Sequence, residues 1–172
     1  NQPTLGKEEE AAAIKVIRTG WIAQGIEVEQ FEDDFCNYSN ISKGHAVAVS
    51  SGSSALFLSL WALHGHKKQI AYPSYVCSAL RNAVMMVGGH EKLVDNAPNS
   101  PNIDTNELIK KNFDIKIIPH MYGIPIDLSN IESNNIIEDC CQALGAKVNE
   151  KFVGLQGEIG IFSFHATKLM TS

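Results

Sequence analysis

Short apolar segments with strand character alternate with helical segments along most of this chain, and this alternation most constrains its fold. The expected strands are residues 45–49, 69–72, 92–94, 115–119 and 135–138, and the helices between them are 54–64, 78–87 and 106–111. Strands that alternate with helices need right-handed crossovers and form mostly parallel sheets with both faces covered. The pattern therefore predicts a three-layer α/β/α fold, with any ligand beyond the carboxyl ends of the strands.

Two more helices are expected ahead of the alternating region. Residues 7–19 have an amphipathic pattern that Gly20 would end, and residues 28–38 place apolar side chains along one edge. We expect residues 1–38 to form an N-terminal helical segment and residues 39–172 to form a larger α/β domain.

The composition excludes several classes of function. The chain has 172 residues, of which 44% are hydrophobic, and this suffices for a sizeable core. The net charge of -5 is scattered, which argues against nucleic acid or an anionic membrane as a partner. The longest apolar stretch, residues 55–63, is far shorter than the ~20 residues of a membrane span. The four cysteines show no CxxC spacing, so we expect reduced thiols, no metal site and a cytoplasmic location.

A turn of small residues stands between the first expected strand and the helix after it. Gly52 would let the backbone approach an anion closely, and the free amides of the helix start, with the Ser53 or Ser54 hydroxyl, could bind a phosphate. Helix capping by serine is the simpler interpretation, and for the turn alone it is the favoured one. The turn is neither a GxxxxGK[ST] loop nor a GxGxxG turn, so it indicates a phosphate site only together with other residues.

The apolar segment 135–137 runs into two acids, Glu138 and Asp139. Successive strand residues face opposite sides, so only one of the two can point at a given ligand. A carboxylate beside a pyridine nitrogen keeps that nitrogen protonated, but an acid here can equally well end a strand or cap a helix. Gln142 follows Asp139 by about one helical turn and could donate to a phenolate oxygen, although a lone glutamine more often satisfies backbone groups.

Ser163 interrupts the apolar segment 159–164, and Lys168 follows that serine by five residues. An amine just beyond a buried strand loses hydration, which favours its nucleophilic form and lets it react with an aldehyde and then transfer protons. Most lysines are solvated, so Lys168 alone indicates little. Together with the serine turn, Asp139 and Gln142, it predicts a site for pyridoxal 5'-phosphate (PLP).

Several motifs in this order are similar to those of the DegT/DnrJ/EryC1/StrS family of PLP-dependent aminotransferases, which mostly act on nucleotide-linked keto sugars. The motifs are residues 20–25, 28–32, 51–56, 72–75, 119–123, 138–146 and 162–168. The resemblance covers nearly the whole chain. It implies the large domain of a fold type I aminotransferase, incomplete here because the rest of its sheet and a small C-terminal domain would follow Lys168.

The resemblance also implies roles for the candidate residues. Lys168 would form the Schiff base with the cofactor aldehyde, and Asp139 would pair with the pyridine nitrogen, so these two are the expected catalytic residues. Gln142 would contact the ring hydroxyl. The phosphate would be held by Ser163, Gly52, Ser53 and Ser54.

The implied reaction moves an amino group, usually from glutamate in this family, to a ketone of a nucleotide-linked sugar. Relatives that dehydrate sugars carry histidine in place of the lysine, so Lys168 favours aminotransfer. The active sites of the family include residues of a partner subunit, which implies a homodimer.

Other functions stay open at this point. Cys77 stands where the family usually has an aromatic ring that stacks on the cofactor, and the chain ends soon after Lys168. A non-catalytic regulatory or assembly protein with the PLP fold, or an inactive fragment, would therefore also fit. A Rossmann-like nucleotide binder would use only the small-residue turn before the helix at 54–64. It leaves Asp139, Gln142 and Lys168 unexplained and ranks last.

Overall fold

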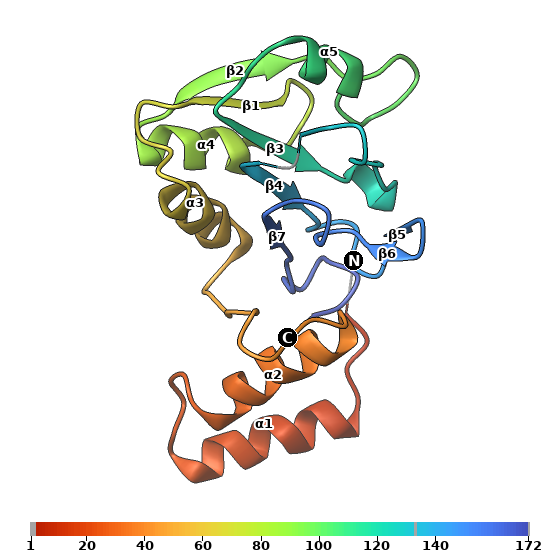
Figure 1. Cartoon of the computed structure of the whole chain (residues 1–172). Coiled ribbons are helices and arrows are strands. Elements are labelled where there is room, and N and C mark those ends of the chain that lie inside the picture. Colours follow the sequence, from red (N-terminus) through yellow and green to blue (C-terminus); the bar gives the residue numbers. More distant parts are fainter. Residues whose placement is uncertain (1–2, 133, 172) are drawn as a thin grey trace. The chain divides into compact units, whose positions relative to one another are not determined.

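The computed structural model describes residues 3–132 and 134–171 (Figure 1). The chain divides into two compact units, Asn1–Val49 and Ser50–Ser172. Among the described residues, no helix has the length and the apolar character to cross a membrane.

The first unit contains the two N-terminal helices that the sequence predicts. Helix α1 spans Lys7–Thr19, and Gly20 forms its C-cap with a left-handed φ of 72°. Only glycine adopts this conformation without strain, so the predicted end of the helix is confirmed. Helix α2 spans Ile26–Tyr38.

The prediction of a strand at residues 45–49 is wrong. Within the described residues, this segment pairs with no strand. The amide of Ala48 instead donates to the Glu32 carboxylate at 2.7 Å, and its carbonyl accepts from the Gln24 side chain at 3.4 Å. The Val47 side chain is 79% exposed. Apolar alternation gives a segment the propensity to be a strand, but a strand also needs a neighbour with free backbone groups, and here side chains take those groups.

The second unit is built on a five-stranded parallel sheet with the strand order β2-β1-β3-β4-β7. The strands are β1 (Gln69–Pro73), β2 (His90–Val94), β3 (Ile115–Pro119), β4 (Ile136–Asp139) and β7 (Ile159–Ile161). The parallel sheet predicted from the sequence is confirmed, although the first expected strand is not part of it.

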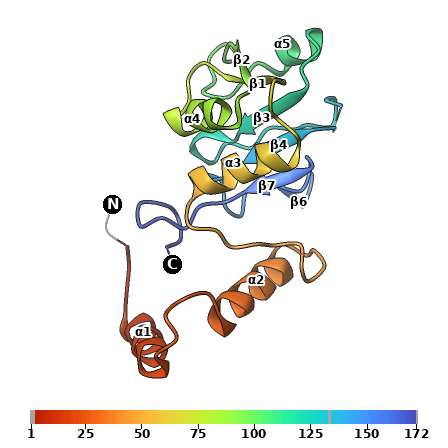
Figure 2. The ribbon, with the colours of Figure 1, turned by 90° about the vertical axis from the view of Figure 1, so that its left-hand side faces the viewer.

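Helices and short elements connect these strands. They are α3 (Gly52–Ala62), α4 (Ser78–Val87), α5 (Thr105–Lys110), the 3-10 helix η1 (Met121–Gly123) and the antiparallel pair β5 (Lys147–Val148) and β6 (Lys151–Phe152). Helices α3 and α4 pack against each other on one face of the sheet (Figure 1 and Figure 2). The three predicted helices of this unit are confirmed to within two residues at each end.

Alternation along the strands divides the buried side chains into two layers. One layer contains side chains of α3 and α4, and the other contains side chains of α5 and of the loops near it. In β4, Ile137 belongs to the first layer and Ile136 to the second. Because strand side chains alternate, Asp139 faces the α3 side and Glu138 faces the α5 side. The predicted three-layer α/β/α architecture is confirmed.

Candidate functional site

The carboxyl ends of β4 and β7 meet the start of α3 at one edge of the sheet. Asp139 ends β4 and pairs in register with Ile161, which ends β7, and Ser163 follows two residues later. A Cβ atom placed on Gly52 would lie 3.3 Å from the Cys141 Sγ atom and 3.8 Å from the Ser163 Oγ atom. The fold thus brings three predicted site residues from distant parts of the sequence to one place.

The first turn of α3 keeps amide groups available for an anion. The Ser51 hydroxyl accepts from the amide of Ser54 at 3.1 Å, and the Ser51 carbonyl accepts from the amide of Ala55 at 2.9 Å. Within the described residues, the amides of Gly52 and Ser53 have no acceptor. The serine cap is therefore present, and it leaves two amides at the positive end of the helix, where a phosphate can bind.

The Asp139 carboxylate is fixed at the end of its strand. Its Oδ1 atom accepts from the amide of Cys141 at 3.0 Å, and the side chain is partly buried. Burial and then the Asp139 carboxylate raise the pKa of the Cys141 thiol, whereas the charge of Lys168 lowers it. The Asp139 carboxylate thus lies beside Cys141, which is close to the start of α3 at Gly52.

Lys168 lies in a turn beyond β7. Its amide donates to the carbonyl of His165 at 2.8 Å, and its side chain is partly buried. Within the part of the chain that the structure describes, its amine makes no hydrogen bond or ion pair. The amine is thus available to a ligand, because no described side chain holds it.

Gln142 is oriented by the loop that contains η1. Its Oε1 atom accepts from the amide of Tyr122 at 2.9 Å. A Cβ atom on Gly123, whose φ is 78°, would lie 3.3 Å from the Gln142 carbonyl oxygen, so the two loops are in close contact. A backbone amide can only face the oxygen of the glutamine side chain, so the Nε2 group of Gln142 remains a donor for another partner.

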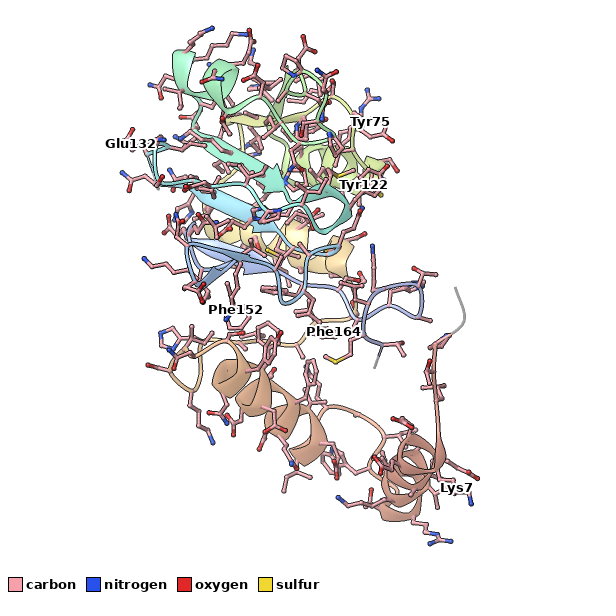
Figure 3. The ribbon with its side chains drawn as sticks, turned by 90° about the vertical axis from the view of Figure 1, so that its right-hand side faces the viewer. Lys7, Tyr75, Tyr122, Glu132, Phe152 and Phe164 are labelled. Carbon is pink, nitrogen blue, oxygen red and sulfur yellow. The ribbon has the colours of Figure 1, made fainter. Side chains whose placement is uncertain are left out.

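Two tyrosines come from the loops that follow β1 and β3. The hydroxyl oxygens of Tyr75 and Tyr122 lie 2.8 Å apart, and both side chains are exposed (Figure 3). Cys77 is the N-cap residue of α4. It lies in the loop that follows the carboxyl end of β1, so it belongs to the same carboxyl edge of the sheet.

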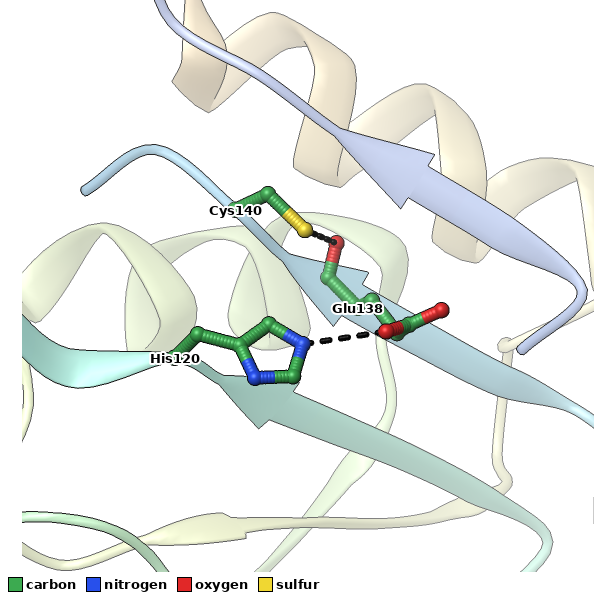
Figure 4. Close-up of side chains that lie close together, drawn as sticks. All are labelled: His120, Glu138 and Cys140. Atoms are coloured by element: carbon green, nitrogen blue, oxygen red, sulfur yellow. Dashed lines mark hydrogen bonds and ion pairs between the residues drawn. The ribbon is translucent and has the colours of Figure 1, made fainter. Parts of the chain in front are cut away.

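The first of the two acids, Glu138, has a role that sequence reasoning missed. Its side chain is fully buried. Its Oε1 atom accepts from the amides of Gln156 and Gly157, both at 2.7 Å, and its Oε2 atom accepts from the Gly154 amide at 2.9 Å and from His120 Nε2 at 3.0 Å (Figure 4). Burial alone would raise the pKa of Glu138, but the hydrogen bonds from His120 and the three amides lower it overall, so the group is a buried carboxylate.

His120, Glu138 and Cys140 place three atoms of metal-binding type within 4.8 Å of one another. These atoms already take part in hydrogen bonds. His120 Nδ1 accepts from the amide of Ile126 at 3.0 Å, so the ring is neutral and its Nε2 carries the proton donated to Glu138. The buried Cys140 thiol, whose pKa burial raises, lies 3.9 Å from the Glu138 carbonyl and donates to it. We therefore interpret the cluster as a hydrogen-bond network.

A parallel sheet whose carboxyl edge carries an acid, a hydroxyl and free helix amides is typical of α/β domains that bind a ligand at this edge. Residues 3–172 match the model of the DegT/DnrJ/EryC1/StrS aminotransferase family. The chain belongs to this family.

Solved structures share the fold. The aminotransferase TlmJ from Streptoalloteichus hindustanus is 28% identical, with a TM-score of 0.92 over 99% of this chain and 49% of that chain. An aminotransferase from Psychrobacter cryohalolentis is 27% identical, with a TM-score of 0.89 over 99% of this chain and 46% of that chain. Spr1654 from Streptococcus pneumoniae, in its PLP form, is 23% identical, with a TM-score of 0.90 over 99% of this chain and 49% of that chain. This chain thus spans about half the length of the solved relatives that it matches.

The family is one of PLP-dependent aminotransferases. The comparisons therefore confirm four predictions made from the sequence. These are the family, the fold class, and the cofactor and enzyme class of that family.

Proposed function

We propose that this chain is the cofactor-binding part of an aminotransferase that moves an amino group from glutamate to the ketone of a nucleotide-linked sugar. The observation that carries the proposal is the proximity of Asp139, Ser163 and Gly52 around Cys141. Lys168 follows Ser163 by five residues in the same segment of the chain. The nucleotide-linked sugar as substrate and glutamate as donor are supported by the ordered family motifs of the sequence.

The residues at this edge fit PLP. A phosphate needs several donors, and the amides of Gly52 and Ser53 together with the Ser163 hydroxyl offer them. A methyl group on Gly52 would crowd the Cys141 sulfur at 3.3 Å, so glycine keeps this space open. A pyridine nitrogen needs an anion, and Asp139 supplies one at the end of the adjacent strand.

When bound, PLP supplies an aldehyde that carries the amino group and a ring that takes up electrons from the substrate. Asp139 would keep the proton on the ring nitrogen, because a carboxylate at hydrogen-bond distance stabilises that cation. Lys168 would hold the aldehyde carbon, and its amine would transfer protons to and from the substrate. The Gln142 Nε2 group would donate to the ring oxygen, and the α3 amides with Ser163 would anchor the phosphate.

The proposal also includes a homodimer in the cytoplasm. The dimer follows from the resemblance, because the sites of the family include residues of a partner subunit. The cytoplasmic location is supported by the four cysteines, all of which are free thiols. We assign residues 39–172 to the PLP-binding domain and residues 1–38 to a helical segment ahead of it.

The test uses purified full-length protein and its visible absorption. We expect a PLP band that borohydride reduction removes, that glutamate shifts to the amine form of the cofactor, and that is absent in Lys168→Ala. Lys151→Ala is the matched control, because Lys151 is an exposed lysine in β6 and should leave the band unchanged. A wild-type protein that stays colourless with added PLP would contradict the proposal, and a band that glutamate does not shift would indicate binding without aminotransfer.

A further inference from the structure

A buried carboxylate joins three segments of the second unit. Glu138 is fully buried and charged, and it accepts four hydrogen bonds of 3.0 Å or shorter. A charge in a protein core is costly unless every lone pair is satisfied, so the fold keeps Glu138 only because these donors stay in place. The donors come from the end of β3 and from the turn that precedes β7.

The turn before β7 connects Glu138 to the residues that follow that strand. Gly154 of the turn donates to Glu138 and lies closely against β7, so that a Cβ atom on Gly160 would clash with the Gly154 carbonyl oxygen. Backbone packed this closely does not shift independently. Fixing the turn therefore fixes β7, and the chain continues from β7 directly to Ser163 and Lys168.

His120 makes the second connection, from the end of β3. Its Nε2 donates to Glu138, and its Nδ1 accepts from the amide of Ile126, so both ring nitrogens are used. The ring thereby holds His120 and Ile126 together and fixes the loop between these two residues, which contains η1. That loop holds Gln142 through the amide of Tyr122.

We propose that Glu138 and His120 form a buried pair that positions Asp139, Gln142 and Lys168 for the cofactor. Both are positioning residues rather than catalytic ones, because Glu138 faces the α5 side of the sheet and Asp139 faces the α3 side. The inference rests on the proposed function, since it concerns the geometry of the groups that would contact PLP.

The experiment measures PLP affinity and thermal stability of full-length variants. Both oxygens of the Glu138 carboxylate accept hydrogen bonds from N–H groups. Glu138→Gln replaces one of these oxygens with an NH2 group, which cannot accept, so the N–H groups that faced that oxygen lose their acceptor. His120→Phe keeps a ring without polar atoms, and His120→Gln restores a donor and an acceptor. Leu108→Ala is the matched control, because Leu108 is fully buried in α5 and its truncation destabilises the core without touching the network.

We expect Glu138→Gln and His120→Phe to weaken PLP binding about 10-fold or more and to reduce the rise in Tm that a fixed PLP concentration causes. His120→Gln should recover part of that affinity. Leu108→Ala should lower Tm with and without PLP equally and keep the PLP Kd within about twofold of wild type. A purely structural role would make Glu138→Gln behave like Leu108→Ala, and this result would overturn the inference.

Two further outcomes are decisive. A wild-type protein that binds no PLP refutes the proposed function itself, before any variant is compared. If Glu138→Gln shows no cooperative unfolding, it is not folded and the two His120 variants test the inference instead. In these variants Glu138 keeps its three backbone donors. Equal PLP affinity in His120→Phe and wild type would then overturn the inference.

Discussion

Replacing Asp139 by asparagine tests the polarity of the site without disturbing its shape. In the structure, Oδ1 of Asp139 accepts from the amide of Cys141 at 3.0 Å. An asparagine keeps this acceptor, so the side chain should hold the same orientation. Its other atom becomes an NH2 group, which cannot accept the proton of a pyridine nitrogen.

The size of the effect follows from the single interaction lost. A hydrogen bond to a charged group contributes about 1.5–3 kcal/mol. At about 1.4 kcal/mol for each factor of ten, the kcat/KM of Asp139→Asn for the amino donor should fall about 10- to 150-fold. The free energy of unfolding should stay within about 0.5 kcal/mol of wild type, because the bond to the Cys141 amide is retained.

Steady-state kinetics of full-length Asp139→Asn with glutamate, together with urea unfolding, measures both quantities. Asp139→Ala is the comparison variant, because it also removes the acceptor for the Cys141 amide and should lower stability as well as activity. Wild-type kcat/KM in a folded Asp139→Asn would refute the assignment of this carboxylate to the ring nitrogen.

Three predictions concern stability, each measured by chemical denaturation. Asp104→Ala should cost about 1 kcal/mol, because the Asp104 carboxylate caps α5 through two backbone amides. Gly154→Ala should cost about 2 kcal/mol or more, because φ is +90° and the new methyl group would lie 2.5 Å from the Phe162 ring. The lowered pKa of Glu138 means that the folded state binds its proton less readily than the unfolded state. Its contribution is therefore full above the unfolded pKa and is lost as the pH falls through the folded pKa, so wild type should lose more stability than Glu138→Gln between about pH 5 and pH 3. Equal losses of stability in wild type and Glu138→Gln would contradict the predicted lowering of the Glu138 pKa.

The sheet and its helices could be predicted because each element carries its own local signal. Strand β3 is buried along its whole length, and apart from Lys116 its residues are apolar, which is typical of a central parallel strand. Helix α4 coincides with residues 78–87 because an apolar face and the left-handed Gly88 mark its end. The segment 45–49 has a similar local signal, but pairing depends on a distant neighbour, and the sequence does not specify whether one is present.

Candidate site residues could be proposed from the sequence because the chemistry of a cofactor restricts the residue types and their order. The position of Gly52 against Cys141 and Ser163 could not be derived in this way, since contacts across the fold leave no periodic trace in the sequence. The same holds for the donors to Glu138. The segment 154–157 contains two glycines and a glutamine, which are typical of an ordinary surface turn, and nothing local marks it as the partner of a buried acid.

The neighbouring acids Glu138 and Asp139 have different environments because side chains alternate along a strand. Strand alternation places Asp139 on the α3 side. Among the described residues, only Cys141 donates to it there, so a carboxylate oxygen remains for a ligand. The same alternation places Glu138 on the α5 side, where four hydrogen bonds of 3.0 Å or shorter occupy its carboxylate. A one-residue shift of β4 would exchange these environments and leave the site with a carboxylate that has no free lone pair. The register of β4 with β3 and β7 therefore determines the chemistry of the site as directly as the identity of either acid.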